Sequence, residues 1–85
     1  MKSLVSEART HAKSVRVSRG WVIVRLQDER EVRFPTSKSR RLREGTPEAV
    51  KNVELICSGT GLHWPDLDED LSVQGIIEGR FGYGE

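Results

Sequence analysis

The sequence KSVRVSRGWVIVRLQDEREVRFP, residues 13–35, carries the strongest structural signal in the chain. Apolar and polar residues alternate through it, and the apolar positions are mostly valines with a Trp and a Phe. This alternation is typical of strands that bury one face. It predicts a three-stranded meander with strands near residues 13–18, 21–27 and 31–34. Pro35 should end the meander, because proline cannot donate to a strand ladder.

Two short helices are expected after the meander. The run TSKSRRLREG predicts an exposed helix that Thr36 or Ser37 caps and Gly45 stops. A second helix should begin behind Thr46 as cap, with Pro47 in its first turn.

The remaining segments predict one more strand and one more helix. The apolar run at residues 53–57 fits a fourth strand, with Cys57 as a small core residue. Residues 72–78 fit a final helix, because apolar residues recur there at helical spacing. The fold class is therefore α+β, with a small antiparallel sheet of three to four strands and two or three short helices. We expect one domain over residues 13–79, a loose N-terminal arm at 1–12 and a flexible tail at 80–85.

Charge is divided unevenly along the chain, although the net charge of its 85 residues is only +1. Residues 1–51 hold 13 Lys and Arg against 6 acids, which gives +7, and residues 52–85 hold one Arg against 7 acids, which gives −6. Either the two halves face each other and cancel, or they form two surface poles for different partners. No apolar run is long enough for a membrane span, and one cysteine offers neither a disulfide nor a zinc pattern. We therefore expect a cytoplasmic protein with no membrane partner.

The run GLHWPDLDEDL, residues 61–71, is dense in special side chains. Asp66, Asp68 and Asp70 have the spacing of the first calcium-loop ligands, but Leu71 replaces the glycine of that loop and Ile77 replaces its bidentate Glu. Paired carboxylates could also serve acid–base catalysis, but a domain this small offers little room for a substrate cleft. The residues thus favour a protein that is not an enzyme and holds no cofactor. A metal-dependent enzyme at the three aspartates remains the second alternative.

A structural role and a contact role are both open for this run. Trp64 is a core candidate, His63-Trp64-Pro65 would form a packing corner, and the acids would precede the helix at residues 72–78 and cap it. Carboxylates beyond the one needed for capping would form a negative surface for a basic partner. The expected partner-binding residues are His63, Trp64 (as scaffold), Asp66, Asp68, Glu69 and Asp70.

Basic residues offer an alternative interface. Lys38, Arg40, Arg41 and Arg43 lie within six residues and would attract phosphate. Trp21 is the one aromatic near them that could stack on a base. A solvated charged surface is the other interpretation.

The segment FPTSKSRRLREGTPEAVKNVELICSGTGLHWPDLDEDLSVQGIIEG, residues 34–79, resembles the bacterial domain-of-unknown-function family 2442. The hallmark of that family, G-I-H-W-P-D-L-D-E-D-I-S-V-E-G-L-L, is matched nearly letter for letter by Gly61 to Ile77. The resemblance implies a small α+β domain and no agreed activity. Family members occur beside small genes in arrangements that suggest toxin–antitoxin or regulatory pairs, and some are fused to a DNA-binding helix-turn-helix. This chain departs from the family at Asp28-Glu29, where members often carry Asp-Gly, so we expect a different turn there.

The leading prediction is a small regulatory interaction module, antitoxin-like, that binds a small basic protein through its acidic motif. The alternative is a nucleic-acid-binding regulatory domain. The sequence does not determine the oligomeric state.

Overall fold

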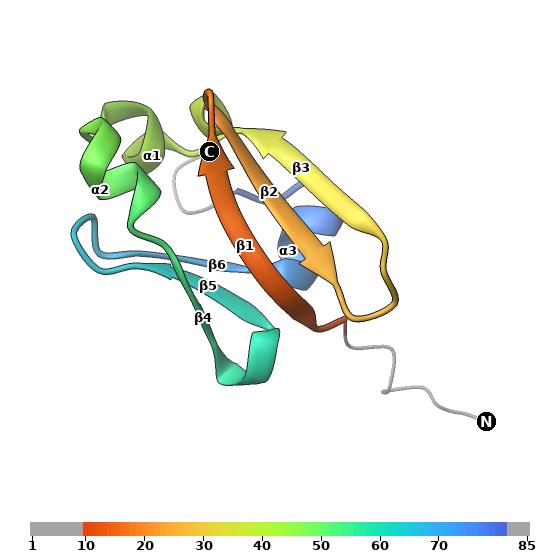
Figure 1. Cartoon of the computed structure of the whole chain (residues 1–85). Coiled ribbons are helices and arrows are strands. Elements are labelled where there is room, and N and C mark those ends of the chain that lie inside the picture. The colour runs from red at the N-terminus through yellow and green to blue at the C-terminus, as the bar shows by residue number, and fades with distance from the viewer. Residues whose placement is uncertain (1–9, 82–85) are drawn as a thin grey trace.

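The alternating stretch forms the first sheet, as predicted (Figure 1). In the computed structural model, which describes residues 10–81, three antiparallel strands pair in chain order: β1 (Ala12–Ser18), β2 (Trp21–Leu26) and β3 (Glu31–Pro35). Val22, Val24 and Leu26 point inward from β2 and are buried, whereas Trp21 and Arg25 are exposed. The turn between β2 and β3 places Glu29 at φ 76°, a conformation that glycine would adopt at lower cost.

A second three-stranded antiparallel sheet is built from β4 (Glu54–Ile56), β5 (Gly61–Trp64) and β6 (Glu69–Ser72). The α+β prediction is confirmed, but only one strand was expected in this part of the chain. The acidic run is a β-hairpin, so its predicted role as the entry to a helix is wrong. The final helix, α3 (Val73–Ile77), is capped instead by Ser72, whose hydroxyl accepts from the backbone N–H of Gly75 at 2.8 Å.

The segment between the sheets is helical, with one difference from the prediction. The expected helix over residues 36–45 is divided into a 3-10 turn (Thr36–Lys38) and α1 (Arg40–Glu44) by Ser39, which has an extended backbone and is buried. The helix α2 (Pro47–Lys51) begins as predicted, because the side chain of Thr46 accepts from Ala49 N–H.

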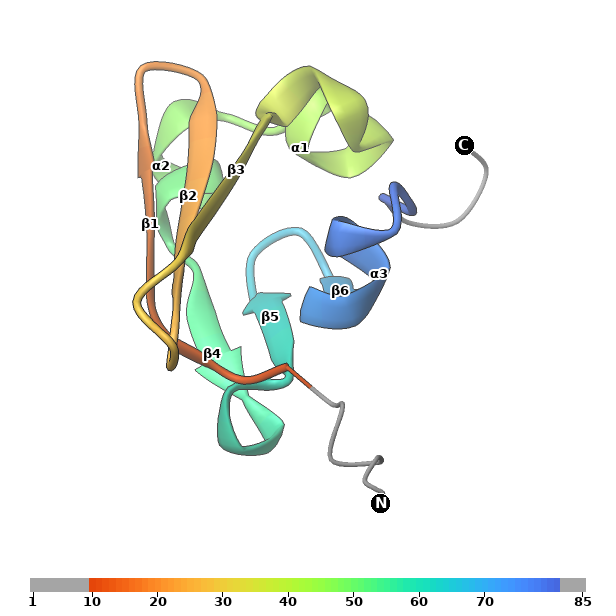
Figure 2. The same cartoon turned by 90° about the vertical axis from the view of Figure 1, so that its right-hand side faces the viewer.

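The inner faces of the two sheets share one hydrophobic core. Figures 1 and 2 show β4 beside β1, with β5, β6 and α3 on the inner side of the first sheet. Trp64 and Leu62 of the second sheet are fully buried in this core together with Phe34 of the first. The opposite face of the first sheet carries no other strand or helix of the described chain (Figure 2).

The ends of the described chain make ordered contacts. Most of the arm predicted at residues 1–12 and of the tail predicted at 80–85 lies outside the described residues. Ala12 belongs to β1 and is buried, and the ring of Phe81 lies 4.9 Å from that of Phe34. β1 thus begins one residue before the predicted domain start at 13, and Phe81 lies two residues after its predicted end at 79. None of the described helices has the length and apolar character needed to cross a membrane.

Candidate functional site: the hairpin of β5 and β6

The conspicuous run at residues 61–71 forms a hairpin whose strand register sorts its side chains onto two faces. Trp64 pairs with Glu69, and Leu62 pairs with Leu71, and all four of these side chains are buried. The row between them pairs His63 with Asp70, and these two side chains face outward. Because side chains alternate along a strand, residues adjacent in sequence point to opposite faces, one buried and one facing solvent.

The strands are joined by a turn that holds two more carboxylates. The N–H of Leu67 donates to the carbonyl of Trp64 at 3.2 Å, and Asp68 takes φ 53°. Asp is among the few residues that tolerate this left-handed conformation. Asp66 and Asp68 are both exposed at the tip.

Two buried hydrogen bonds fasten the hairpin to the body of the domain. The indole Nε1–H of Trp64 donates to the carbonyl of Val50 at 2.8 Å, which ties β5 to α2. The hydroxyl of Ser39 donates to Glu69 Oε2 at 2.9 Å, which ties β6 to the segment before α1. Glu69 is only 5% exposed, so it serves this internal bond and cannot be the partner contact that its sequence predicted.

The tip is also held from outside by polar side chains of the preceding helices. Arg41 of α1 donates to the carbonyls of Leu67 and Asp68 at 3.1 and 3.0 Å. Asn52, at the end of α2, donates to Asp66 Oδ2 at 3.0 Å. The basic and acidic halves of the chain therefore meet here, and the guanidinium of Arg41 donates its hydrogen bonds to the turn.

On the outward face, His63 lies between two carboxylates. The protonated Nδ1 of His63 donates to Asp70 Oδ1, and Glu54 of β4 is its cross-strand partner on the other side. The hydrogen bond that His63 donates to Asp70, then the charges of Asp70, Glu54 and Asp68, raise the pKa of His63 above its ordinary value of 6.5. The net charge of the row formed by Glu54, His63 and Asp70 is closer to zero when His63 is protonated and more negative when His63 is neutral.

The three aspartates proposed as a metal site are not assembled as one. Asp66 is bonded to Asn52, Asp70 to His63, and Asp68 faces Arg41 with 4.0 Å between carboxylate and guanidinium. Within residues 10–81, no three His, Cys, Asp or Glu side chains come together in a way that could hold a metal ion. The donor set needed for the metal-dependent alternative is thus absent from this part of the chain.

The predicted basic patch is similarly dispersed. Arg41 binds the hairpin turn, Arg40 forms an ion pair with Glu44 at 3.6 Å, and Arg43 donates to the carbonyl of Ser37. Lys38 and Arg40 belong to different helical turns separated by Ser39. The three arginines are thus each bonded within the domain, and phosphate binding by the four residues stays a prediction.

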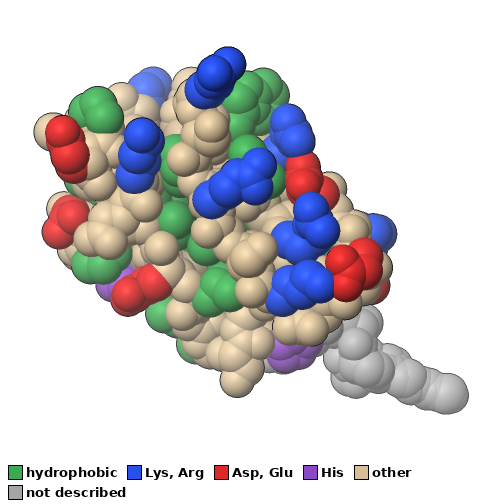
Figure 3. Space-filling model, in the orientation of Figure 1, with side chains coloured by type: hydrophobic (Ala, Val, Ile, Leu, Met, Phe, Trp, Pro, Cys, Tyr) green, Lys and Arg blue, Asp and Glu red, His purple; other side chains and the backbone are tan. Residues whose placement is uncertain are grey.

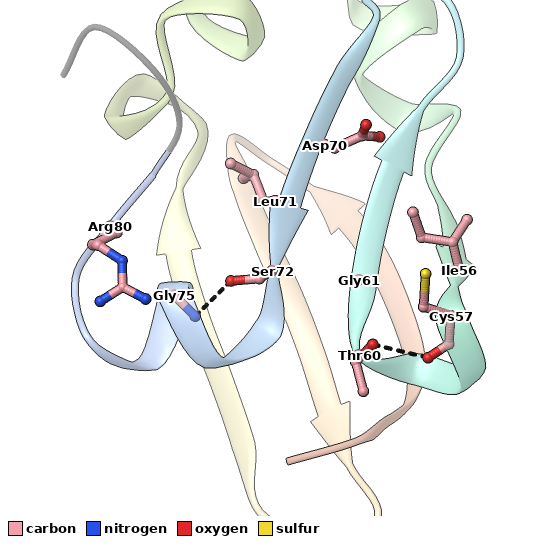
Figure 4. A pocket seen from close by; sticks show the side chains of 9 residues that line it. All are labelled: Ile56, Cys57, Thr60, Gly61, Asp70, Leu71, Ser72, Gly75 and Arg80. Atoms are coloured by element: carbon pink, nitrogen blue, oxygen red, sulfur yellow. Dashed lines mark hydrogen bonds between the residues drawn. The ribbon is translucent and has the colours of Figure 1, made fainter. Parts of the chain in front are cut away.

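A shallow hollow lies beside Asp70 on the outward face of the second sheet, and sequence reasoning did not find it (Figure 4). Its cause is Gly61, which stands between Ile56 and Ser72 in the strand register and leaves that row without a central side chain. A Cβ at Gly61 would lie 3.0 Å from Ile56 Cγ1. The hollow is lined by Ile56, Cys57, Thr60, Gly61, Asp70, Leu71, Ser72, Gly75 and Arg80.

Cys57 is exposed at this hollow rather than buried in a strand, so its predicted core role is wrong. Cys57 takes φ 53° in the 3-10 turn that follows β4. Because this conformation is not extended, the strand ends at Ile56. The sequence signal for this turn was the run Ser58-Gly59, where Ser58 also has positive φ.

Comparison with known proteins agrees with this fold. Residues 12–82 match the family described as "Protein of unknown function (DUF2442)". A crystal structure of a protein of unknown function from Rhodospirillum rubrum is similar over 88% of this chain and 93% of that one, with 34% identity and a TM-score of 0.81. The solution NMR structure of an uncharacterized protein from Chromobacterium violaceum is similar over 87% of this chain and 70% of that one, with 30% identity and a TM-score of 0.75. Among curated proteins, the comparison found no match. This chain belongs to the DUF2442 family.

Proposed function

We propose that this protein is a non-enzymatic, antitoxin-like interaction module that binds a small basic protein through the outward side of the β5–β6 hairpin. The observation that carries the proposal is a turn held by several contacts to the body of the domain, whereas the side-chain carboxylates of Asp68 and Asp70 take no part in those contacts. The hairpin is held to the rest of the domain by hydrogen bonds of Trp64, Glu69 and Arg41. The side chains of Asp68 and Asp70 extend into solvent. A binding surface that is already ordered loses less entropy when a partner docks.

Charge supports a basic partner. Glu54, Asp66, Asp68 and Asp70 all reach solvent on or beside the outward face of the second sheet. Arg41 is the one cation within ion-pair distance of Asp68 among the described residues, and its guanidinium is 4.0 Å away. Such a carboxylate-rich surface accelerates the approach of a positively charged protein and disfavours acidic ones.

The hollow beside Asp70 supports a protein partner in particular. Ile56 and Cys57 give one of its sides an apolar character, and Asp70 supplies an acceptor at its edge. A short basic segment could place an aliphatic side chain in the hollow and a Lys or Arg head on the Asp70 carboxylate. Protein interfaces commonly combine such an apolar pocket with a charged rim.

The hydroxyls of the hollow support a binding role over a catalytic one. Ser72 Oγ accepts from the N–H of Gly75 and so caps α3. Thr60 Oγ1 donates to the carbonyl of Cys57. A nucleophilic hydroxyl needs a base within hydrogen-bond reach, and both of these hydroxyls instead bond to backbone.

The regulatory role, in the cytoplasm and as one half of a toxin–antitoxin or similar pair, is part of the same proposal. It is supported by the small genes that lie beside genes of the family whose hallmark motif this chain matches. An acidic face of this kind could cover a nucleic-acid-binding or active site on a basic toxin.

The test compares three baits in a pull-down from the source cell: wild type, Asp66→Asn/Asp68→Asn/Asp70→Asn, and a control with the same loss of charge, Asp28→Asn/Glu29→Gln/Glu31→Gln. Asn is chosen at position 68 because it tolerates positive φ, and Glu69 is kept because it is buried. The control residues lie at the β2–β3 end of the other sheet. Each bait is checked for folding by circular dichroism and by its melting temperature.

We expect a basic protein to be retained by wild type and by the control, and lost from the triple aspartate variant. The captured protein is then purified and its Kd is measured by calorimetry over a series of salt concentrations. The affinity for wild type should fall with salt, because exposed charges are screened. Equal affinity and equal salt dependence for wild type and the aspartate variant would refute the proposal.

A further inference from the structure

The outer face of the β1–β2–β3 sheet is a second open surface, on the opposite side of the domain from the hollow. Strand register places three cross-strand rows on it. The middle row is Arg16, Ile23 and Arg33, in that order across the sheet. Trp21 stands in the next row, between Ser18 and Pro35. This face is turned to the viewer in Figure 3.

The two arginines of the middle row flank an isoleucine that is largely buried. Ile23 points to the solvent side of β2, yet only 7% of it is exposed. Neither a helix nor another strand of the described chain covers it (Figure 2). Its direct cross-strand neighbours are Arg16 and Arg33. Long basic side chains can cover apolar surface with their aliphatic stems and keep their charged heads in water. Two guanidinium groups are thus positioned on either side of one strand.

Charge is unequal between the two ends of this face. At the β2–β3 end, cations and acids neutralise one another through the pairs Lys13–Glu29, Arg25–Glu31 and Arg30–Asp28. Arg33 of the middle row belongs to this neutralised end, because its guanidinium pairs with Glu31 at 2.5 Å. At the β1–β2 turn, Arg19 and Arg16 form no ion pair with any described residue, and no acid lies between Ala12 and Gln27. Figure 3 shows Lys and Arg side chains spread over the face, with Asp and Glu toward its margins.

The basic end also holds an exposed aromatic ring. Trp21 is 41% exposed and is one of two large apolar side chains exposed in the described chain. A flat ring open to solvent among arginines can stack on an unpaired base, whereas the bases of a duplex are already stacked on each other. Arginines beside such a ring supply contacts to the phosphates that flank the base.

We propose that this end of the outer sheet face binds single-stranded nucleic acid, with Trp21 stacking on a base and Arg16 and Arg19 contacting the backbone phosphates. This site differs from the basic run at residues 38–43, whose arginines are engaged elsewhere. It also lies apart from the acidic hairpin, so a basic protein partner and a nucleic acid could be bound together.

The test is a fluorescence titration with single-stranded RNA and single-stranded DNA of mixed sequence and about ten nucleotides, within the site size of small single-strand-binding domains. Fluorescence anisotropy of a labelled oligonucleotide reports binding. Emission from the protein reports stacking on Trp21, since Trp64 is fully buried and should contribute a constant signal. Three variants accompany wild type: Trp21→Leu, Arg16→Gln/Arg19→Gln, and the matched control Arg25→Gln/Arg30→Gln. The control removes two charges from the neutralised end of the same face.

We expect wild type to bind with quenching of tryptophan emission and with an affinity that falls as salt rises. Trp21→Leu should weaken binding about 5- to 150-fold, the range that corresponds to loss of one stacked base. Arg16→Gln/Arg19→Gln should reduce the slope of log K against log[salt] by about 1.4, because each phosphate contact on a single strand contributes about 0.7. The Arg25 and Arg30 control should stay close to wild type.

Several outcomes would overturn the proposal. These are no binding at low salt, binding without quenching, an equal loss in the control and the Arg16/Arg19 variant, or tighter binding of a duplex of the same sequence. If wild type binds no oligonucleotide but self-associates in sedimentation, and Trp21→Leu abolishes this association, the face is a protein contact instead. The double arginine variant could unfold if it uncovers Ile23. In that case the Trp21→Leu variant alone tests nucleic-acid binding, since Trp21 is exposed and is not part of the described core.

Discussion

Ser39 and Glu69 lie thirty residues apart in sequence and share a buried hydrogen bond, in which the Ser39 hydroxyl donates to Glu69 Oε2 at 2.9 Å. Ser39 is fully buried and Glu69 is 5% exposed. Within the described chain, every buried side-chain nitrogen or oxygen has a hydrogen-bond partner. The bond joins the link before α1 to the first residue of β6, so it fixes the acidic hairpin relative to the helices.

Ser39→Ala should therefore destabilise the domain by about 1–3 kcal/mol, because a buried carboxylate oxygen loses its donor. The measurement is the free energy of unfolding in urea. Ser37→Ala is the matched control, since Ser37 lies two residues earlier and is exposed. Equal unfolding free energies for the two variants would show that the Ser39–Glu69 bond contributes nothing to stability.

Asp70→Asn should lower the pKa of His63, because the hydrogen bond that His63 donates to the Asp70 carboxylate is the largest cause of the raised pKa. A histidine whose folded pKa lies above its unfolded value stabilises the fold below the unfolded value, near 6.5. This contribution is lost as pH rises through the higher folded pKa. The stability advantage of wild type over Asp70→Asn should therefore be larger just below pH 6.5 than in alkaline solution.

The direct measurement is the chemical shift of the His63 ring protons against pH. Asp66→Asn serves as control, since Asp66 is bonded to Asn52 and is not among the groups that displace the His63 pKa. If both variants give the same His63 titration curve as wild type, the Asp70 pairing does not exist in solution.

Local patterns predicted the first sheet and the α2 cap because these elements follow rules of short range. Alternation in residues 13–35 reports burial of one face, and Thr46-Pro47 is a cap followed by a residue suited to the first helical turn. The β5–β6 hairpin was missed because two residues contradict their usual preference. Glu69 is buried although it is charged, and Asp68 takes positive φ where a glycine would have marked the turn.

The candidate site was predicted in part for the same reason. The strand period in Leu62-His63-Trp64 would have placed His63 outward and Trp64 inward had the segment been recognised as a strand. The burial of Glu69 depends on Ser39, a partner that no local pattern identifies. Similarly, the hollow beside Asp70 depends on the pairing of Gly61 with both Ile56 and Ser72.

Gly59→Ala should be far more destabilising than Gly20→Ala, although both glycines have positive φ, 91° and 83°. An alanine in this conformation costs about 1–2 kcal/mol at either position. At Gly20 the new Cβ meets nothing within 4 Å, whereas at Gly59 it would lie 2.3 Å from the carbonyl oxygen of Ala12. The added cost at Gly59 thus measures the close approach of the β4–β5 loop to β1.

Thermal unfolding of the two glycine variants is the measurement, and Gly20→Ala is the control for backbone strain. The Gly59 variant should melt well below the Gly20 variant. Similar melting temperatures would mean that the β4–β5 loop is not packed against the start of β1.

Arg41→Ala should loosen the tip of the acidic hairpin with little effect on global stability. The Arg41 side chain is 55% exposed, and exposed polar contacts contribute about 1 kcal/mol or less. Its two bonds to the carbonyls of Leu67 and Asp68 nevertheless hold the turn from outside. Amide exchange of Leu67, whose N–H donates to Trp64, should become faster because local opening needs less free energy.

Arg43→Ala is the control for this last variant, since Arg43 lies on the same helix but bonds to Ser37 and not to the turn. A faster Leu67 exchange in Arg41→Ala alone would establish that α1 orders the hairpin tip. The same variant should then bind a basic partner more weakly, although it has lost a positive charge and gained negative potential near Asp68. The loss of positive charge and the loosening of the turn thus change the affinity in opposite directions. Tighter binding would mean that charge governs the interface, and weaker binding would mean that the preformed turn does.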